Sequence, residues 1–254
     1  MQLEVQKRPT LSAFQWIKRG WRVFTLNPSV FMGMAGIMLL VAVLGMVIPL
    51  FNFVAFLLTP FLSAGFFQVA SQVEQENNVE LGDLFQYFNR FKEYRIFFSV
   101  AAVTILLNIP ASILATEIVQ QAAEQIPPSM SDLIVISVLM LVNFMLTAFL
   151  VQSAWVAPKS SVIDLLKMSF KACWVNGLPL TVYGLVSMMI LVVSFPILII
   201  GWVIGYAVLT LMFLQAFLDI YRPVQNDSFD TDFDSEQSID KNEHQNSENR
   251  LDGE

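Results

Sequence analysis

The sequence predicts an all-α polytopic membrane protein with six transmembrane helices in three hairpins, each preceded by an amphipathic interfacial helix on the cytoplasmic side. Three observations support this fold class. Hydrophobic residues make up 56% of the 254 residues and the mean hydropathy is +0.61, whereas soluble domains hold roughly 45–50% apolar residues. Six apolar runs approach the roughly 20 residues that cross a bilayer. Every lysine and arginine falls in segments on one side of those runs.

Charge divides the chain into a membrane part and an acidic tail. The net charge is −7, yet residues 1–218 carry 11 Lys/Arg against 10 Asp/Glu, while residues 219–254 carry 3 against 11. The tail is too polar to bury a core, so we expect it to be disordered. It is either a solubilising spacer or, through Phe229 and Phe233, a docking segment for a basic protein partner. The predicted domains are therefore residues 1–29, 30–218 and 219–254.

Residues 1–29 form a short polar lead followed by an amphipathic helix. Apolar residues recur there at steps of three or four, which places them on one side of a helix: Leu11, Phe14, Ile17, Trp21 and Phe24. The cations Lys18, Arg19 and Arg22 lie off this stripe. A helix of this kind is expected to lie flat at a membrane surface, with its rings among the acyl chains and its cations near the headgroups.

The six apolar runs follow in three pairs. They cover residues 30–47 and 50–69, then 96–114 and 133–152, then 179–195 and 197–218. The first run has no small-residue cleavage site after it, so we interpret it as an uncleaved signal anchor. Ile48-Pro49 and Pro196 leave room only for tight turns, which predicts antiparallel neighbours.

The distribution of cations predicts the orientation. The 14 lysines and arginines lie before the first run, in two polar links at residues 71–95 and 153–178, and after the last run. The links expected on the opposite side, residues 48–49, 115–131 and 196, contain none. The positive-inside rule therefore places both termini in the cytoplasm.

The three cytoplasmic segments resemble one another. Each holds an aromatic residue followed by a base. Apolar residues stand at the same three places relative to that aromatic, namely seven before, four before and three after it. These residues are Phe14, Ile17 and Phe24 in the first segment; Leu84, Tyr87 and Tyr94 in the second; and Ile163, Leu166 and Cys173 in the third. This pattern predicts a triplicated unit of one interfacial helix and one hairpin; the alternative is chance, because aromatic-basic pairs are common in cytoplasmic links. The candidate lipid-surface residues are Trp21, Arg22, Lys18, Arg19, Phe91, Lys92, Phe170 and Lys171.

The predicted spans contain amides and hydroxyls but no Asp, Glu, Lys, Arg or His. Ion-coupled carriers usually hold ionisable groups within the membrane, so this absence argues against that class. The candidate intramembrane polar residues are Asn108, Asn143 and Asn52. By helical rise, Asn108 and Asn143 should meet across their hairpin, either as an interhelical hydrogen bond or as the lining of a path for a small solute.

The remaining candidate residues are two glycines of the last span and the single cysteine. Gly201 and Gly205 form a small-xxx-small motif that packs a helix either within the chain or in a dimer. Cys173 is the only cysteine and occupies a stripe position, which favours a buried structural thiol over a lipidated one. Because the only histidine, His244, lies in the tail, we find no nucleophile-base pair and no metal site, and we predict a non-enzyme without a cofactor.

Some motifs also carry a family resemblance. The pieces GWRVFTLNPSVFMG and WVAP...MSFKACWVNGLPLTVYG resemble an uncharacterised family of bacterial inner-membrane proteins, over about residues 11 to 222. The resemblance implies a six-span bacterial inner-membrane protein without an assigned reaction.

Together these observations favour a non-enzymatic scaffold or accessory component of the bacterial envelope, whose basic interfacial helices contact anionic lipid. The alternative is a transporter or channel for an uncharged or amphiphilic small solute. Nothing in the sequence predicts nucleic-acid binding, and an oligomer is possible without specific support.

Overall fold

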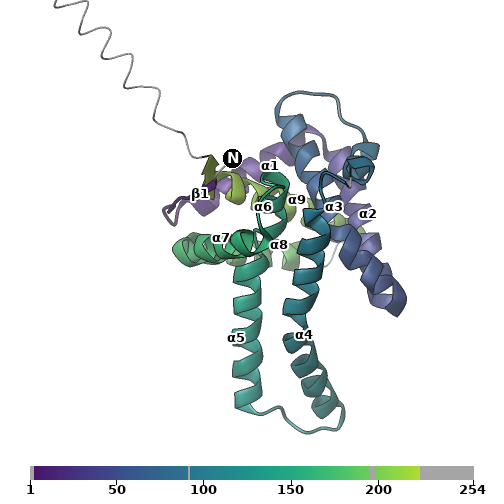
Figure 1. The fold of residues 1–254 in the computed structure, drawn as a ribbon, viewed down its shortest axis with the longest axis vertical. Coiled ribbons are helices and arrows are strands. Elements are labelled where there is room, and N and C mark those ends of the chain that lie inside the picture. The colour runs from purple at the N-terminus through teal and green to yellow at the C-terminus, as the bar shows by residue number, and fades with distance from the viewer. Residues whose placement is uncertain (1–2, 91, 195–197, 224–254) are drawn as a thin grey trace, which may run out of the picture. The chain divides into compact units, whose positions relative to one another are not determined.

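The computed structural model describes residues 3–90, 92–194 and 198–223. The chain divides into two compact units, Val5–Arg222 and a second unit formed by Met1–Glu4 with Pro223–Glu254. The helices of the described ranges, which Figure 1 labels, all belong to the larger unit. The disorder expected for residues 224–254 lies outside the described residues.

The fold is all-α apart from two short strands that pair in a two-stranded sheet. In chain order the elements are β1 (Leu3–Val5), α1 (Ser12–Leu26), α2 (Pro28–Val47), α3 (Pro49–Glu74), the 3₁₀ helix η1 (Leu81–Arg90), α4 (Ile96–Ala123), α5 (Met130–Thr147), α6 (Leu150–Val156), α7 (Val162–Val175), α8 (Gly177–Ser194), α9 (Leu198–Ile220) and β2 (Tyr221–Pro223). Within the described residues, six helical segments are long and apolar enough to cross a membrane. The predicted polytopic membrane fold is confirmed.

Helix ends explain most differences from the predicted spans. Pro28 and Pro49 begin α2 and α3, the first-turn position that proline favours because it has no N–H to leave unpaired. At the other ends, α3 reaches Glu74 and α4 reaches Ala123. Good helix formers such as alanine and glutamine extend α4 through much of the predicted link at residues 115–131. The turn predicted at Pro196 lies outside the described residues.

The fourth predicted span is not one continuous helix. It breaks into α5 and α6 at Ala148 and Phe149. The Ser169 hydroxyl of α7 accepts a hydrogen bond from the Phe149 N–H at 3.1 Å and donates one to the Met145 carbonyl at 2.9 Å. These two groups would bond each other in an unbroken α-helix, so Ser169 inserts into the ladder and causes the break.

Removing this hydroxyl should destabilise the protein. We expect Ser169→Ala to lower the free energy of unfolding by about 1–3 kcal/mol, because Ser169 is fully buried and one buried and one partly buried backbone group lose their partner. Chemical unfolding of the purified protein in detergent measures the change. Ser137→Ala is the matched control, since this exposed hydroxyl bonds only its own helix; an equal loss in both variants would contradict the role of Ser169.

The helices of each predicted hairpin pack against each other, namely α2 with α3, α4 with α5 and α8 with α9. Packing also crosses these pairs, since α2 contacts α9 and α3 contacts α4. The three shorter elements α1, η1 and α7 each pack on one long helix. Both η1 and α7 pack on the long helix that precedes them in the chain, which is α3 for η1 and α5 for α7. Helix α1 packs on the last helix, α9 (Figure 1). The division into three hairpins stays a prediction.

Helix α1 is docked on the bundle through a face that the sequence pattern did not indicate. Its buried face is made of Ala13, Trp16, Gly20 and Val23, whereas most of the predicted stripe is exposed or half-buried and only Phe24 is buried. Gly20 permits the docking, because a Cβ there would lie 2.6 Å from the Met212 backbone. The expectation that the whole stripe faces acyl chains is therefore corrected: α1 buries a neighbouring face and leaves the stripe on its flank.

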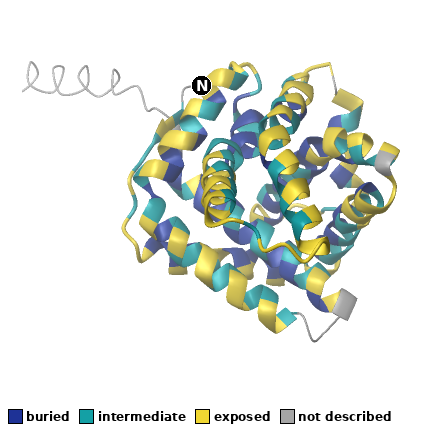
Figure 2. Ribbon diagram, turned by 90° about the horizontal axis from the view of Figure 1, so that it is seen from below, coloured by how far each residue is buried: buried dark blue, intermediate teal, exposed yellow. Residues whose placement is uncertain are grey.

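Helix α7 has the same pattern of burial as α1. When the two are aligned through Trp21 and Phe170, every position from Phe14 to Thr25 except Arg19 has the same degree of burial as its counterpart. Trp16 and Gly20, both buried, correspond to Leu165 and Ser169, also buried. Figure 2 shows more generally that buried and exposed residues alternate along the helices.

The second predicted interfacial segment is different. It forms the 3₁₀ helix η1, whose stripe residues Leu84 and Tyr87 are both buried, and Tyr87 belongs to a core cluster with Phe61 and Phe97. Gly65 of α3 makes this possible, because a side chain there would collide with the Leu84 carbonyl. The segment is thus helical with one buried face, but the expectation that its stripe lies among acyl chains is corrected because the bundle covers it; triplication of the unit stays a prediction.

Candidate functional site

The first candidate site is the outer surface of α1. Its buried face points into the bundle, Lys18 and Arg22 lie exposed on the opposite face, and Arg19 lies exposed at the side between the two faces. The aromatic side chains of Phe14 and Trp21 are 56% and 52% exposed on the flank between those two faces. The helix thus presents apolar rings and cations side by side, the arrangement that suits the boundary between acyl chains and headgroups.

Helix α7 presents the same combination. Lys167 and Lys171 are exposed, and Phe170 stacks on the largely exposed Trp174 with ring centroids 6.1 Å apart. Of the second segment's candidates, Lys92 is exposed and Phe91 lies outside the described residues. The structure therefore repeats an aromatic-cationic surface on α1 and α7.

A buried polar cluster joins the N-terminal lead to the end of α9, and we call it the Asp219 cluster. Asp219 pairs with Arg8 at 3.2 Å and accepts a hydrogen bond from Trp16 Nε1 at 3.0 Å. Arg8 also donates to the Asp219 carbonyl, through Nε at 2.9 Å and Nη2 at 2.6 Å. Nearby, the Asn176 amide accepts from the Arg8 N–H at 2.7 Å and donates to the Gln6 carbonyl at 3.0 Å.

This cluster was missed at the sequence level. Residues 219 onward were assigned to the tail, but α9 continues through Ile220 and the Asp219 side chain is only 14% exposed. The polar lead is likewise tied to the body, since the Gln6 N–H donates to the Ile220 carbonyl at 2.9 Å. The sequence offered one signal for this ion pair: Asp219 directly follows an apolar run, and Arg8 lies shortly before α1.

The two intramembrane asparagines meet. Asn143 Nδ2 donates to Asn108 Oδ1 at 2.8 Å, and Asn108 Nδ2 donates to the Thr104 carbonyl at 2.8 Å. Asn52 acts elsewhere, donating to the Gly45 carbonyl at 3.2 Å across the turn between α2 and α3. The amides therefore connect neighbouring helices or turns.

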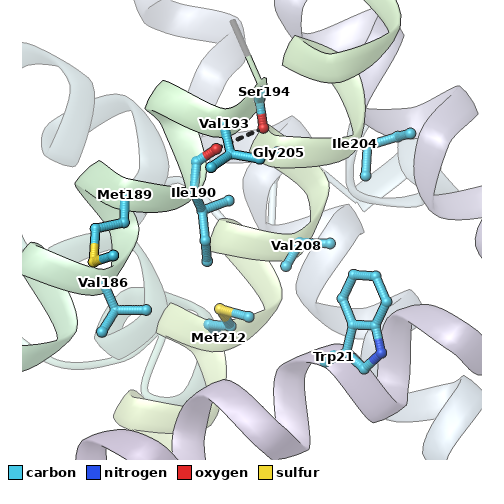
Figure 3. Close-up of a pocket in the computed structure, with 10 residues that line it drawn as sticks. All are labelled: Trp21, Val186, Met189, Ile190, Val193, Ser194, Ile204, Gly205, Val208 and Met212. Atoms are coloured by element: carbon cyan, nitrogen blue, oxygen red, sulfur yellow. Dashed lines mark hydrogen bonds between the residues drawn. The ribbon is translucent and has the colours of Figure 1, made fainter. Parts of the chain in front are cut away.

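Gly205 lies in contact with α8. A Cβ at Gly205 would lie 3.0 Å from Ser194 Oγ, so the small residue faces a helix of the same chain; Gly201 is also buried. Below this contact an apolar groove of about 380 Å³ runs between α8 and α9, with Trp21 of α1 at one end (Figure 3).

A second apolar groove, of about 350 Å³, lies between α5, α7 and α8. Its lining includes Cys173, Trp174 and Gly184. Burial raises the pKa of the Cys173 thiol to about 12, so the group stays neutral at physiological pH and is a poor nucleophile.

Comparisons of the chain with protein-family models, with curated proteins and with solved structures gave no match. The functional argument therefore depends on the chain's own geometry.

Proposed function

We propose that this protein is a non-enzymatic scaffold or accessory component of the bacterial inner membrane, held at the cytoplasmic leaflet by contacts of α1 and α7 with anionic lipid. The observation that carries the proposal is the shared surface of these two helices. Each docks one face on the bundle and leaves exposed aromatic rings beside exposed cations, Trp21 beside Lys18 and Phe170 beside Lys167. Anionic headgroups attract such cations by about 1 kcal/mol each near the surface.

The scaffold role is supported by how the polar groups within the spans are used. Asn108 and Asn143 bond each other, and Thr59, Thr147 and Thr210 donate to carbonyls of their own helices. Neither asparagine lines the grooves between α8 and α9 or between α5 and α8. Their donor groups are therefore used within the protein, which supports a packing role over the lining of a path.

Transport of a small solute is the second candidate, and one observation favours it. Asn143 Oδ1 is buried without a hydrogen-bond partner among the described residues, so it could accept from a passing donor. Vesicles containing the full chain would then leak small uncharged solutes, and Asn143→Leu would stop the leak. On the scaffold proposal, vesicles with and without the protein retain solute equally.

Lipid contact is tested by the thermal stability of the full chain in vesicles of neutral lipid alone and of neutral lipid mixed with phosphatidylglycerol. Anionic lipid should raise the melting temperature, and high salt should reverse the gain because it screens exposed charges. The double variant Lys18→Gln, Lys167→Gln should lose a large part of the gain. A wild-type melting temperature that is independent of anionic lipid would refute the lipid contact.

The cytoplasmic placement of both termini is part of the proposal. Lys159 and Glu124 are exposed in links on opposite sides of the predicted membrane. In spheroplasts, an impermeant maleimide should label Glu124→Cys at once and Lys159→Cys only after the membrane is opened. The reverse order would invert the topology.

A further inference from the structure

The cationic face of α1 borders a pocket that the lipid-surface argument does not use. The pocket has a volume of about 270 Å³ and is lined by Arg19, Arg22, Val23, Leu26 and Glu74. Four of these residues belong to α1, whereas Glu74 is the last residue of α3. The pocket therefore lies where the side of α1 meets the end of a membrane-spanning helix.

The carboxylate in this pocket is held in place. Gln215 of α9 is only 5% exposed, and its Nε2 donates to Glu74 Oε1 at 3.0 Å. This hydrogen bond occupies one oxygen of the carboxylate and orients it. Glu74 makes no salt bridge within the part of the chain that the structure describes, so its negative charge remains available to a cation.

The two guanidinium groups are also available. Arg19 and Arg22 are three residues apart, which places them next to each other on the helix surface. Both side chains are exposed, and within the described ranges neither guanidinium makes a hydrogen bond or a salt bridge, although both attract the Glu74 carboxylate electrostatically. The pocket thus combines two unpaired cations with one oriented anion.

Its position sets the depth at which a ligand would bind. The apolar span of α3 ends at Glu74, so the pocket lies at the level where the span leaves the hydrocarbon and enters the headgroup layer. Leu26, which is 55% exposed, and Val23 give the pocket an apolar edge. A molecule with charged groups on one side and hydrocarbon on the other fits both features.

We propose that this pocket binds the phosphoethanolamine headgroup of a zwitterionic phospholipid, with the phosphate on Arg19 and Arg22 and the primary ammonium on Glu74. Guanidinium forks match phosphate oxygens in geometry and charge. An anionic headgroup without an amine should bind less well, because its phosphate would lie close to the Glu74 carboxylate and it has no ammonium group to pair with that carboxylate. The inference deepens the proposed lipid contact and rests on it.

The test is native mass spectrometry of the full chain in detergent with equal amounts of phosphatidylethanolamine and phosphatidylglycerol. Wild type should retain phosphatidylethanolamine preferentially. Arg19→Gln with Arg22→Gln should weaken that retention about tenfold or more, the scale of losing charge-assisted hydrogen bonds. Glu74→Gln should retain both lipids about equally, since only the ammonium contact is lost.

Controls separate the pocket from general lipid contact and from misfolding. Lys159→Gln removes an exposed cation that lies outside both the pocket and α1, so it should keep the preference of the wild type. Each variant must also melt as one cooperative transition. Free phosphoethanolamine should compete with the lipid and inorganic phosphate should not; competition by phosphate alone would overturn the role of the ammonium.

The inference is overturned if wild type shows no preference or if Glu74→Gln leaves the preference unchanged. Such a result differs from failure of the proposed function. Loss of headgroup preference with intact stabilisation by anionic lipid refutes only the pocket, whereas loss of all lipid dependence refutes the lipid contact itself.

Discussion

Asp219→Ala is expected to lower the free energy of unfolding by about 2–4 kcal/mol. The substitution removes the ion-pair partner of Arg8 and the hydrogen-bond acceptor of Trp16, whose side chain is fully buried. Losing one partner of a buried charged pair costs about 3–5 kcal/mol. The Arg8 and Asp219 side chains retain 17% and 14% exposure, and Arg8 keeps its hydrogen bond to the Asp219 carbonyl, so we expect a loss about 1 kcal/mol smaller than that range.

Chemical unfolding in mixed micelles measures this loss, and Asp164→Ala is the matched control. Asp164 lies exposed in the first turn of α7, where its charge stabilises the helix by about 0.3–1 kcal/mol. A double-mutant cycle with Arg8→Ala should give a coupling free energy of about 1 kcal/mol or more. If the two substitutions are additive, or if Asp164→Ala costs as much as Asp219→Ala, the Asp219 cluster does not hold the lead to α9.

Gly20→Val is expected to cost about 2–3 kcal/mol. Its Cβ would lie 2.6 Å from the Cα and N of Met212, and those are backbone atoms that cannot rotate away. Overpacking a close helix contact typically costs about 1–3 kcal/mol, and here α1 must shift along its whole contact with α9. The substitution should also expose Trp16, which raises its quenching by a water-soluble quencher.

Gly36→Ala is the control, because a Cβ at Gly36 meets no atom within 4 Å. Glycine is less favourable than alanine inside a helix by about 1 kcal/mol, so this variant should be neutral or more stable. Equal destabilisation by Gly20→Val and Gly36→Ala would show that the close approach of α1 to α9 does not contribute to stability.

Local signals predicted the membrane fold well. The apolar runs are long and continuous, so hydropathy alone locates each span, and Pro28 and Pro49 mark where two of the helices begin. The meeting of Asn108 and Asn143 was also predictable, because two helices joined by a known link have a computable relative depth. These features depend on residues that are close in sequence.

Features that depend on distant residues were not predictable in the same way. The break between α5 and α6 is caused by the hydroxyl of Ser169, which belongs to another helix. On α1, periodicity selected the bulky stripe through Phe14, but the small residues Ala13 and Gly20 form the docked face because they allow closer approach. A stripe of large side chains indicates an apolar surface without saying whether protein or lipid covers it.

The same limit applies to the sites. Glu74 was interpreted as part of a solvated link, because its partners Arg19, Arg22 and Gln215 are far away in sequence. Asp219 was assigned to the tail on composition, although its ion pair makes it part of the membrane body.

The central claim is that α1 and α7 occupy the membrane interface in the same register, with aromatic flanks in lipid and cations in water. Spin labels at Phe14→Cys and Ile163→Cys, and at Lys18→Cys and Lys167→Cys, test it in vesicles of the full chain carrying Cys173→Ala. The account predicts that oxygen relaxes the first pair more strongly and that a water-soluble nickel complex relaxes the second pair more strongly. Nickel accessibility that is equally high at all four positions would contradict it.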